Sequence, residues 1–523
     1  MDLAPPVEQA PVVRLKFNVG AGFDVMSGSY LEGRYGQQVL NGGHAVVTGL
    51  TGKGNTFKST LMRFLGYTAY VRATSAVKAT KLASRGNTYD TEMNSEEVHL
   101  SDIMYRIELQ STLWGPKPEI SSIESNHWTV TDGTIYTGNK WYEVHKPYME
   151  MKVKNADKIS VTTPFWNRTH TGPFTIPMPT FQDIDSFTRF ETDNVIDMQD
   201  SAELGDQAHL MVHQKQGLAK KILLMEIPRL ASASYVFTTM VAHLGKESAI
   251  QKGPAQHGGP ETSLSGLKNG DKLMGVTKDF SFAMLNLWQS VNAKALLDGN
   301  LAPEYPRDAS DRRRMDADLM EIQVKNLRGK SGPSNMPFVV LSSQSEGVLP
   351  FLTEFHHIRQ EGYFGMEASG NKANFSLHLY PSVNLQRTTV RGKLDADAKL
   401  RRAVTITSEL CQMSYLWHGY DEDVIVAPKV LYDDLIALGY DWDILLQTRG
   451  WWTVNDEDHP VPYLSTMDLL NMRLKKYVPY WYPDDLVPDA VKDVPRIKPP
   501  KPVHAPEWYD LVMRKKETAK EAK

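Results

Sequence analysis

The sequence predicts an α/β fold built on a mainly parallel sheet, and two observations support this class. Short runs rich in β-branched and aromatic residues, typical of buried strands, alternate with segments whose apolar residues recur at helical spacing. Strands that alternate with helices usually form a parallel sheet, because each helix carries the chain back to the start of the next strand. The strand candidates are residues 45–49, 178–187, 234–244, 280–288, 319–327 and 337–343.

The composition is that of a soluble globular protein large enough for several domains. The 523 residues are 41% hydrophobic and 23% charged, and no apolar run is long enough for a transmembrane helix. The formal net charge of −4 excludes a general polycation, so nucleic-acid contact must come from a local basic surface. The single cysteine, Cys411, excludes an internal disulfide and a multi-cysteine zinc site. With no apolar secretory region at the N-terminus, we expect a cytoplasmic protein without a membrane partner.

The chain divides into a core, an insertion and flanking segments. Residues 1–38 form an N-terminal segment that is Pro-rich and then strand-like, and residues 39–358 form the α/β core. Within the core, residues 100–178 are rich in Thr, Trp, Tyr and Pro and are predicted to be an insertion of short strands and loops. Residues 359–490 are expected to form a small C-terminal α+β domain, and residues 491–523 a Pro-rich linker with a charged tail.

The stretch "TGKGNTFKST" at residues 51–60 joins the strand candidate 45–49 to a helix predicted over residues 59–74. This order of strand, Gly-rich loop and helix is the context of a phosphate-binding loop. The pattern G-x-x-x-x-G-K-[ST] would place glycine where this chain has Phe57. Without that glycine, the pattern arises by chance in roughly one chain in four of this length at average residue usage. The stretch alone is therefore compatible with a nucleotide site or with a coincidence.

In a phosphate-binding loop, glycines let backbone N–H groups turn inward around phosphate oxygens, next to the N-terminus of the following helix. Gly52 and Gly54 suit this role. Lys58 would reach the β- and γ-phosphates of ATP, and the Ser59 hydroxyl would bind Mg²⁺. The predicted ATP-binding residues of this loop are Gly52, Lys53, Gly54, Asn55, Thr56, Phe57, Lys58, Ser59 and Thr60.

Such a site also needs an acid near the metal ion and a group that orients the attacking water. Asp90 and Glu92 in "TYDTEMN", and Asp183 and Asp185 in "TFQDIDSF", are the candidates. Taken singly, each carboxylate could be an ordinary solvated turn residue.

Taken together, the segments "GKGNTFKS", "YDTE", "DIDS", "ELGDQAHL", "FTTMVAHL" and "VKNLRGK" have the order of the RecA-type recombinase core. The chain resembles that family over about residues 40–358, and within it the UvsX recombinases of tailed phages, which also have Phe before the Lys-Ser pair. The resemblance implies a RecA-like P-loop ATPase fold for the core. It also implies that residues 1–38 contact a neighbouring protomer.

The resemblance assigns roles to matched residues. Glu92 would position the hydrolytic water, and Asp185 would be the Walker B aspartate that holds Mg²⁺. His243 would sense the γ-phosphate and pass the signal to the loop that follows it. Here the chain departs from the family, since UvsX proteins have Asn before this His and Ala242 stands in its place. A strand-end histidine with a purely local hydrogen bond is the alternative.

The segment "QVKNLRGK" resembles the family's strand whose basic side chains reach across the filament interface to a neighbour's ATP. Lys325 matches the first of these cations, and Arg328 is chosen for the second because strict spacing falls on Leu327. A cation supplied by a neighbour would stabilise charge on the γ-phosphate. A solvated strand-end lysine is the alternative.

Two loops would line the DNA in this family, and they correspond to residues 201–210 and 245–272. The second is flexible in composition and basic, which suits a grip on single-stranded phosphates. A plain surface loop is the alternative. The predicted DNA-binding residues are Lys246, Lys252, Lys268 and Lys272.

The function expected from the resemblance is that of an ATP- and Mg²⁺-dependent DNA recombinase. It would form helical filaments on single-stranded DNA and exchange strands with double-stranded DNA in recombination, repair or replication, with single-strand-binding and loader proteins as possible partners. For a phage protein, the compartment would be the host cytoplasm. The alternatives are a DnaB-like hexameric helicase, against which the short segment before the core argues, and a non-catalytic RecA-fold phage structural protein.

Overall fold

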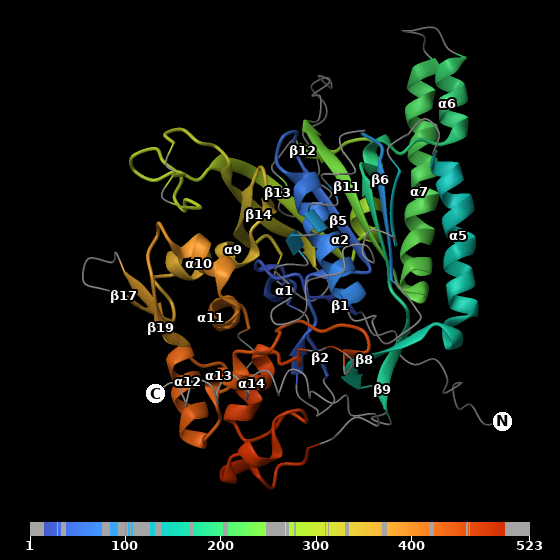
Figure 1. Ribbon diagram of the computed structural model, residues 1–523. Helices are drawn as coiled ribbons and strands as arrows, with labels where there is room; N and C mark the ends of the chain where they lie inside the picture. Colours follow the sequence, from blue (N-terminus) through green and yellow to red (C-terminus); the bar gives the residue numbers. More distant parts are fainter. Residues whose placement is uncertain are drawn as a thin grey trace, which may run out of the picture.

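The structure is a computed structural model, shown in Figure 1. It describes residues 15–28, 30–32, 38–75, 84–92, 100, 103–104, 106–107, 126–130, 137–166, 172–201, 208–246, 267, 271–276, 279–308, 310–311, 313–329, 334–368, 374–417, 423–456, 459 and 461–496.

A large sheet forms the centre of the molecule. In order across it lie β16 (Gly347–Val348), β15 (Pro337–Ser343), β14 (Leu319–Gly329), β13 (Asn286–Ala295), β5 (Val47–Gly52), β11 (Val236–Lys246), β10 (Thr180–Asp185), β6 (Arg85–Asp90) and β7 (His127–Val130). The strands from β13 to β7 are parallel, whereas β14, β15 and β16 extend the sheet in antiparallel fashion. The predicted α/β class with a large, mainly parallel sheet is therefore confirmed.

The connections diverge at β5. Helix α2 (Lys58–Ser75) leads from β5 to β6, which lies beyond β11 and β10, while the chain after β11 passes to β13 on the other side of β5. In open α/β sheets, ligands bind at the carboxyl ends of the strands where the connections diverge in this way. The loop predicted to bind phosphate lies at this point.

Three helices lie side by side at one side of the sheet in Figure 1: α5 (Gly138–Lys154), α6 (Asp193–Asp200) and α7 (Ala208–Ser234). Helix α2 instead packs along β10 and β11. The helix predicted over residues 59–74 and the strand predicted over 234–244 are close to the observed α2 and β11.

The prediction of only short strands and loops for residues 100–178 is wrong, because α5 lies within them. Its buried side chains include Trp141, His145 and Met149, a helical spacing that aromatic and Thr-rich neighbours obscure in the sequence. The Thr137 side chain caps the helix by accepting a hydrogen bond from the backbone of Lys140. Strand β7 of the same segment joins the central sheet beside β6, and β8 (Ser160–Trp166) pairs with β9 (Pro173–Pro177).

The strand candidate at residues 280–288 divides into two elements. Its first half is helix α8 (Asp279–Ala283), and β13 begins only at Asn286. Phe280 and Met284 are both fully buried, and their separation of one helical turn explains why an apolar run that resembles a strand begins as a helix.

Residues after the sheet combine helices with a small sheet. The strands are β17 (Met366–Ala368), β18 (Phe375–Leu377) and β19 (Tyr380–Leu385). The helices are α9 (Pro350–Gln360), α10 (Val390–Ala396), α11 (Ala398–Leu416), α12 (Pro428–Leu438), α13 (Trp442–Leu445) and α14 (Thr466–Arg473). The domain boundary predicted after residue 358 falls inside α9, which packs on both β15 and α11.

Short pieces near the N-terminus complete the core. Strands β1 (Lys16–Phe17) and β4 (His44–Ala45) pair with each other, as do β2 (Tyr30–Glu32) and β3 (Gln38–Leu40), and α1 (Phe23–Met26) follows β1. The Phe17 ring stacks on Trp452 with 4.4 Å between ring centroids. The first and last thirds of the chain therefore share one buried cluster.

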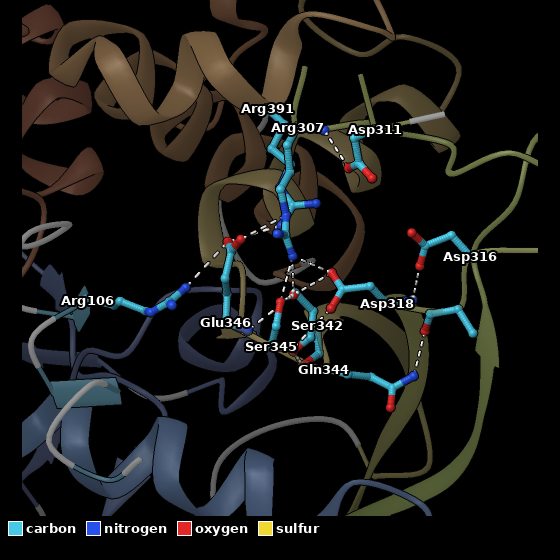
Figure 2. A network of polar contacts seen from close by, with 12 residues as sticks. Arg106, Arg307, Asp311, Asp316, Asp318, Ser342, Gln344, Ser345, Glu346 and Arg391 are labelled. Carbon is cyan, nitrogen blue, oxygen red and sulfur yellow. Dashed lines mark hydrogen bonds and ion pairs between the residues drawn. The ribbon is translucent and has the colours of Figure 1, made fainter. Parts of the chain in front are cut away.

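A charged network on the sheet's antiparallel side also joins the core to the C-terminal helices (Figure 2). The Arg307 guanidinium lies 2.8 Å from a carboxylate oxygen of Asp318 and 3.0 Å from one of Glu346. Arg391 of α10 binds the same Glu346 at 3.0 Å, and Arg106 lies 3.9 Å from it. In this network, called the Arg307 network below, each guanidinium faces a carboxylate.

Candidate functional site

The carboxyl ends of β5, β11, β10 and β6 meet at one edge of the sheet. His243 is opposite Gly52 in the register of β11 and β5, and Asp185 is opposite Asp90 in that of β10 and β6. Glu92 follows two residues after Asp90. The structure therefore brings together the predicted loop, the predicted metal ligand and two predicted catalytic residues, Glu92 from the turn after β6 and His243 from β11.

Loop 53–57 connects the last residue of β5 to the first residue of α2. It is closed by its own side chains, because the Thr56 hydroxyl and the Lys58 ammonium both donate to the carbonyl of Lys53, at 2.9 and 2.6 Å. A Cβ atom on Gly52 would lie 2.6 Å from the Thr56 hydroxyl and 2.7 Å from the Ser290 carbonyl. Glycine is therefore required at position 52, whereas Gly54 has open space around it.

Phe57, the residue that departs from the phosphate-loop pattern, has a left-handed backbone with φ of +61°. Glycine adopts this conformation freely, but a residue with a Cβ atom loses about 1–2 kcal/mol in it. The Phe57 side chain is partly buried against an apolar cluster that includes Leu61 and Phe64. The loop thus keeps a glycine-like shape at position 57, and apolar packing offsets the backbone cost.

Lys58 and Ser59 begin α2 and face the carboxylates. Burial lowers the pKa of Lys58, and the negative charges of Asp185 and Glu92 oppose this shift. The Ser59 hydroxyl donates a hydrogen bond to Asp185. Thr60 follows in the first turn of the helix and is partly exposed.

Asp185 is almost fully buried, and burial raises its pKa, against the effects of the Ser59 hydrogen bond and the charge of Arg63. Its Oδ2 atom has no hydrogen-bond partner among the described residues. Asp183, two residues earlier, has a pKa raised to about 8, mainly by burial. It packs under α2, where a Cβ atom on Gly66 would lie 2.4 Å from its carboxylate. Of the two acids that the sequence offers here, only Asp185 contacts the first turn of α2.

Glu92 and His243 form a direct pair, with 2.6 Å between Oε1 and Nε2. Ser186 donates to the same carboxylate oxygen at 2.9 Å, and the Arg189 guanidinium lies 3.8 Å away. Burial would raise the pKa of Glu92, but the hydrogen bonds from His243 and Ser186 and the charge of Arg189 outweigh it, so the pKa is lowered. Glu92 is therefore a carboxylate at neutral pH.

Ser186 and Arg189 were not predicted from the sequence as functional residues. The available signal was their position, since both lie within four residues after the strand that carries Asp185. Ser290 was also missed: it lies opposite Gly52 on β13, and its hydroxyl donates to the carbonyl of Thr56.

The base of the predicted DNA loop is linked to loop 53–57 through one acid. β12 (Asp271–Leu273) pairs with the end of β11, and buried Asp271 lies 3.3 Å from the Lys246 ammonium and 3.8 Å from that of Lys53. Lys272 is exposed on β12. The predicted DNA-binding residues Lys252 and Lys268 lie outside the described residues, as do residues 202–207 of the other predicted loop.

Lys325 and Arg328 lie on β14, which β13 separates from β5. In register, Lys325 is opposite Gln289, which is itself opposite Thr51, so it is level with the end of β5 but two strands away. Arg328 lies further from this edge, and its guanidinium stacks 5.1 Å from the centre of the Phe282 ring. The fold does not bring either cation to the loop of its own chain, and their role toward a neighbour stays a prediction.

Among the described residues, no group of three or more His, Cys, Asp or Glu side chains is arranged to hold a metal ion. The magnesium prediction therefore rests on Ser59 and Asp185. No helix in the described ranges is long and apolar enough to cross a membrane. The chain matches no family model and no curated protein, so the family likeness rests on its motifs.

Proposed function

We propose that the chain binds and hydrolyses ATP with Mg²⁺ at loop 53–57. The observation that carries this proposal is the Glu92–His243 pair at 2.6 Å, located at the same sheet edge as Lys58, Ser59 and Asp185. These groups come from four elements that are distant in sequence. A nucleotide-hydrolysing site requires these groups to lie close together at one edge. Ordinary solvated turn residues would have no reason to do so.

The residues present fit ATP and magnesium. The buried Lys58 ammonium and the N-terminus of α2 would hold the phosphates. Ser59 and the unpartnered Oδ2 of Asp185 provide oxygen atoms of the kind that Mg²⁺ prefers. Bound Mg²⁺ would neutralise phosphate charge.

Glu92 would act on the attacking water. As a carboxylate held by Ser186 and His243, it can accept a hydrogen bond from water and orient it. His243 lies on the strand that continues to Lys246 and the predicted DNA loop. A change in the Glu92–His243 contact could therefore reach that loop through β11.

The larger proposal, a RecA-type recombinase that forms filaments on single-stranded DNA in the cytoplasm, rests on the motif resemblance. The parallel sheet and the continuity from His243 to a lysine-containing loop support it. Lys325 and Arg328 would act on the ATP of a neighbouring copy, which would couple nucleotide binding to assembly.

The test is ATP hydrolysis with and without single-stranded DNA, for the wild type, Lys58→Ala and Lys429→Ala. Lys429 is an exposed lysine of α12, outside the site, and serves as the matched control. We expect DNA-stimulated hydrolysis that Lys58→Ala abolishes and Lys429→Ala preserves. Hydrolysis that is absent, or indifferent to both DNA and Lys58, would contradict the proposal. Negative-stain images with DNA and an ATP analogue would distinguish a filament from the ring of a hexameric helicase.

A further inference from the structure

A cavity away from the sheet-edge site is lined by residues of α2, α9 and α11. It contains about 680 Å³ of empty space, and this figure includes open solvent at its mouth. Phe64, Phe351 and Trp451 provide apolar and aromatic walls. Its charged lining consists of Asp24, Arg72, Glu354, Arg401, Arg402 and Glu409.

Arg402 is the central group of this lining. Its side chain is 3% exposed, and its Nη2 donates to the carbonyl of Leu464. Its Nε and Nη1 have no hydrogen-bond partner among the described residues. A Cβ atom on Gly450 would lie 2.2 Å from Nη1, so glycine at 450 makes room for the guanidinium at the cavity wall.

The neighbouring Arg401 likewise has an N–H donor without an acceptor among the described residues. Its Nη1 donates to the carbonyls of Leu394 and Asp395, both at 2.8 Å, while its Nε has no partner in the described part of the chain. A buried N–H group without an acceptor is costly, and more so when it carries charge. The two adjacent arginines therefore have N–H donors for which the described residues provide no acceptor.

The carboxylates of the lining already have donors of their own. Asp24 accepts from the backbone of Val19, Gly20 and Gly43. The other two lie on α9 and α11. Glu354 accepts from the Ala21 backbone and the Thr405 hydroxyl, and Glu409 accepts from Thr466.

Burial also weakens the negative charge of the lining. It raises the pKa of Glu354 to about 8 and that of Glu409 to about 7. Glu354 is therefore mostly neutral at pH 7, so the three arginines of the lining face less negative charge than three ionised carboxylates would supply. The Arg307 network of Figure 2 differs in that each of its guanidinium groups faces a carboxylate.

We propose that this cavity binds a small organic anion, in which a carboxylate or phosphate group on Arg401 and Arg402 is attached to a flat or apolar body. Guanidinium N–H groups match the oxygens of both kinds of anion. The Arg72 guanidinium, 5.0 Å from the centre of the Trp451 ring, lines the same space, and the aromatic walls suit a ring. The proposal does not depend on ATP hydrolysis.

The test is calorimetric titration of the full chain with benzoate, phenyl phosphate and neutral benzyl alcohol. We expect both anions to bind and benzyl alcohol not to bind. Arg402→Met should weaken anion binding by at least about tenfold. Arg229→Met, which removes an exposed arginine of α7, should leave it unchanged. Lys58→Ala should also leave phenyl phosphate binding unchanged, because the ligand would occupy the cavity and not loop 53–57.

Gly450→Ala is a second variant of the cavity, and it tests anion binding if the Arg402→Met protein does not fold. It keeps every charge but places a methyl group against Nη1, so we expect it to weaken anion binding as well. The proposal is overturned if neither anion binds at millimolar concentration, which would indicate a cavity for water only. It is also overturned if benzyl alcohol binds as well as benzoate, if Lys58→Ala removes the binding, or if the folded cavity variants bind like the wild type.

Discussion

Buried charged groups near the two halves of helix α2 differ in the hydrogen bonds that they lack. Near its N-terminus, the Oδ2 of Asp185 is an acceptor without a partner among the described residues. Beside its C-terminal half, Arg401 and Arg402 have N–H donors without a partner in the same part of the chain. Lys58 and Arg72, which mark the two places, are about 21 Å apart along the helix axis. Buried charge alone therefore does not say what a site binds. The unsatisfied hydrogen-bonding groups indicate the kind of ligand, because an unsatisfied acceptor suits a cation and unsatisfied donors suit an anion.

The largest effect is expected from a substitution that removes the negative charge of Asp185. Asp185→Asn should raise the Mg²⁺ concentration for half-maximal ATP binding by about 10- to 100-fold, because the metal loses a carboxylate. Asp183→Asn is the matched control on the same strand. With a pKa raised to about 8, Asp183 is mostly protonated at pH 7 and resembles Asn already. A fluorescent ATP analogue titrated at several Mg²⁺ concentrations measures the shift. Equal effects of the two variants would mean that Asp185 has no special relation to the metal.

The middle of α2 connects the two places, and a substitution there tests the fold that both depend on. Gly66→Ala should lower the free energy of unfolding by about 1–3 kcal/mol, because the new methyl group would overlap the Asp183 carboxylate. Gly54→Ala should change stability little, since nothing lies within 4 Å of the added atom. Urea unfolding monitored by Trp fluorescence gives both values. A stable Gly66→Ala protein would show that α2 and β10 can separate at small cost.

Glu354, in the lining of the cavity, should also affect how the free energy of unfolding depends on pH. The ordinary pKa of a glutamate is 4.5, and burial raises that of Glu354 to about 8. The folded state then keeps a proton that the unfolded state releases, so the free energy of unfolding falls as pH rises from about 4.5 towards 8. Glu354→Gln should flatten this decline, and exposed Glu367→Gln should not. Melting temperatures between pH 5 and pH 8 test it, and an unchanged slope in Glu354→Gln would contradict it.

The smallest expected effect concerns Phe57. Phe57→Gly and Phe57→Ala both lose the ring's packing, but only glycine is free of the left-handed backbone cost. Phe57→Gly should therefore be more stable than Phe57→Ala by about 1 kcal/mol. Chemical denaturation of the two variants side by side measures the difference. The reverse order would mean that position 57 is not left-handed in solution.

The sequence predicts which segments meet at the sheet edge, because each of the motifs involved is local. Each motif ends a strand, and parallel strands place their carboxyl ends at one edge. Loop 53–57, Asp185 and His243 could therefore be placed in advance. Ser186 and Arg189 could not be assigned to Glu92, since that contact depends on how the turn after β10 folds.

The cavity could not be predicted at all. Its lining joins residues near position 20, α2, α9, α11 and Gly450, which no short pattern connects. Helix α5 was missed for a different reason, because its neighbours favour strands and loops locally, and tertiary packing of Trp141 and His145 decides the outcome.

Phe57 has a consequence for how related chains are found. A search pattern that requires glycine before the Lys-Ser pair covers only one of the residue types that can adopt a left-handed backbone there. Here a bulky residue adopts a left-handed backbone, with φ of +61°, and its partly buried ring packs against an apolar cluster. Chains with this solution will escape a letter-based pattern. They would be recovered by one that looks for a left-handed residue between a buried strand and a helix that begins with lysine.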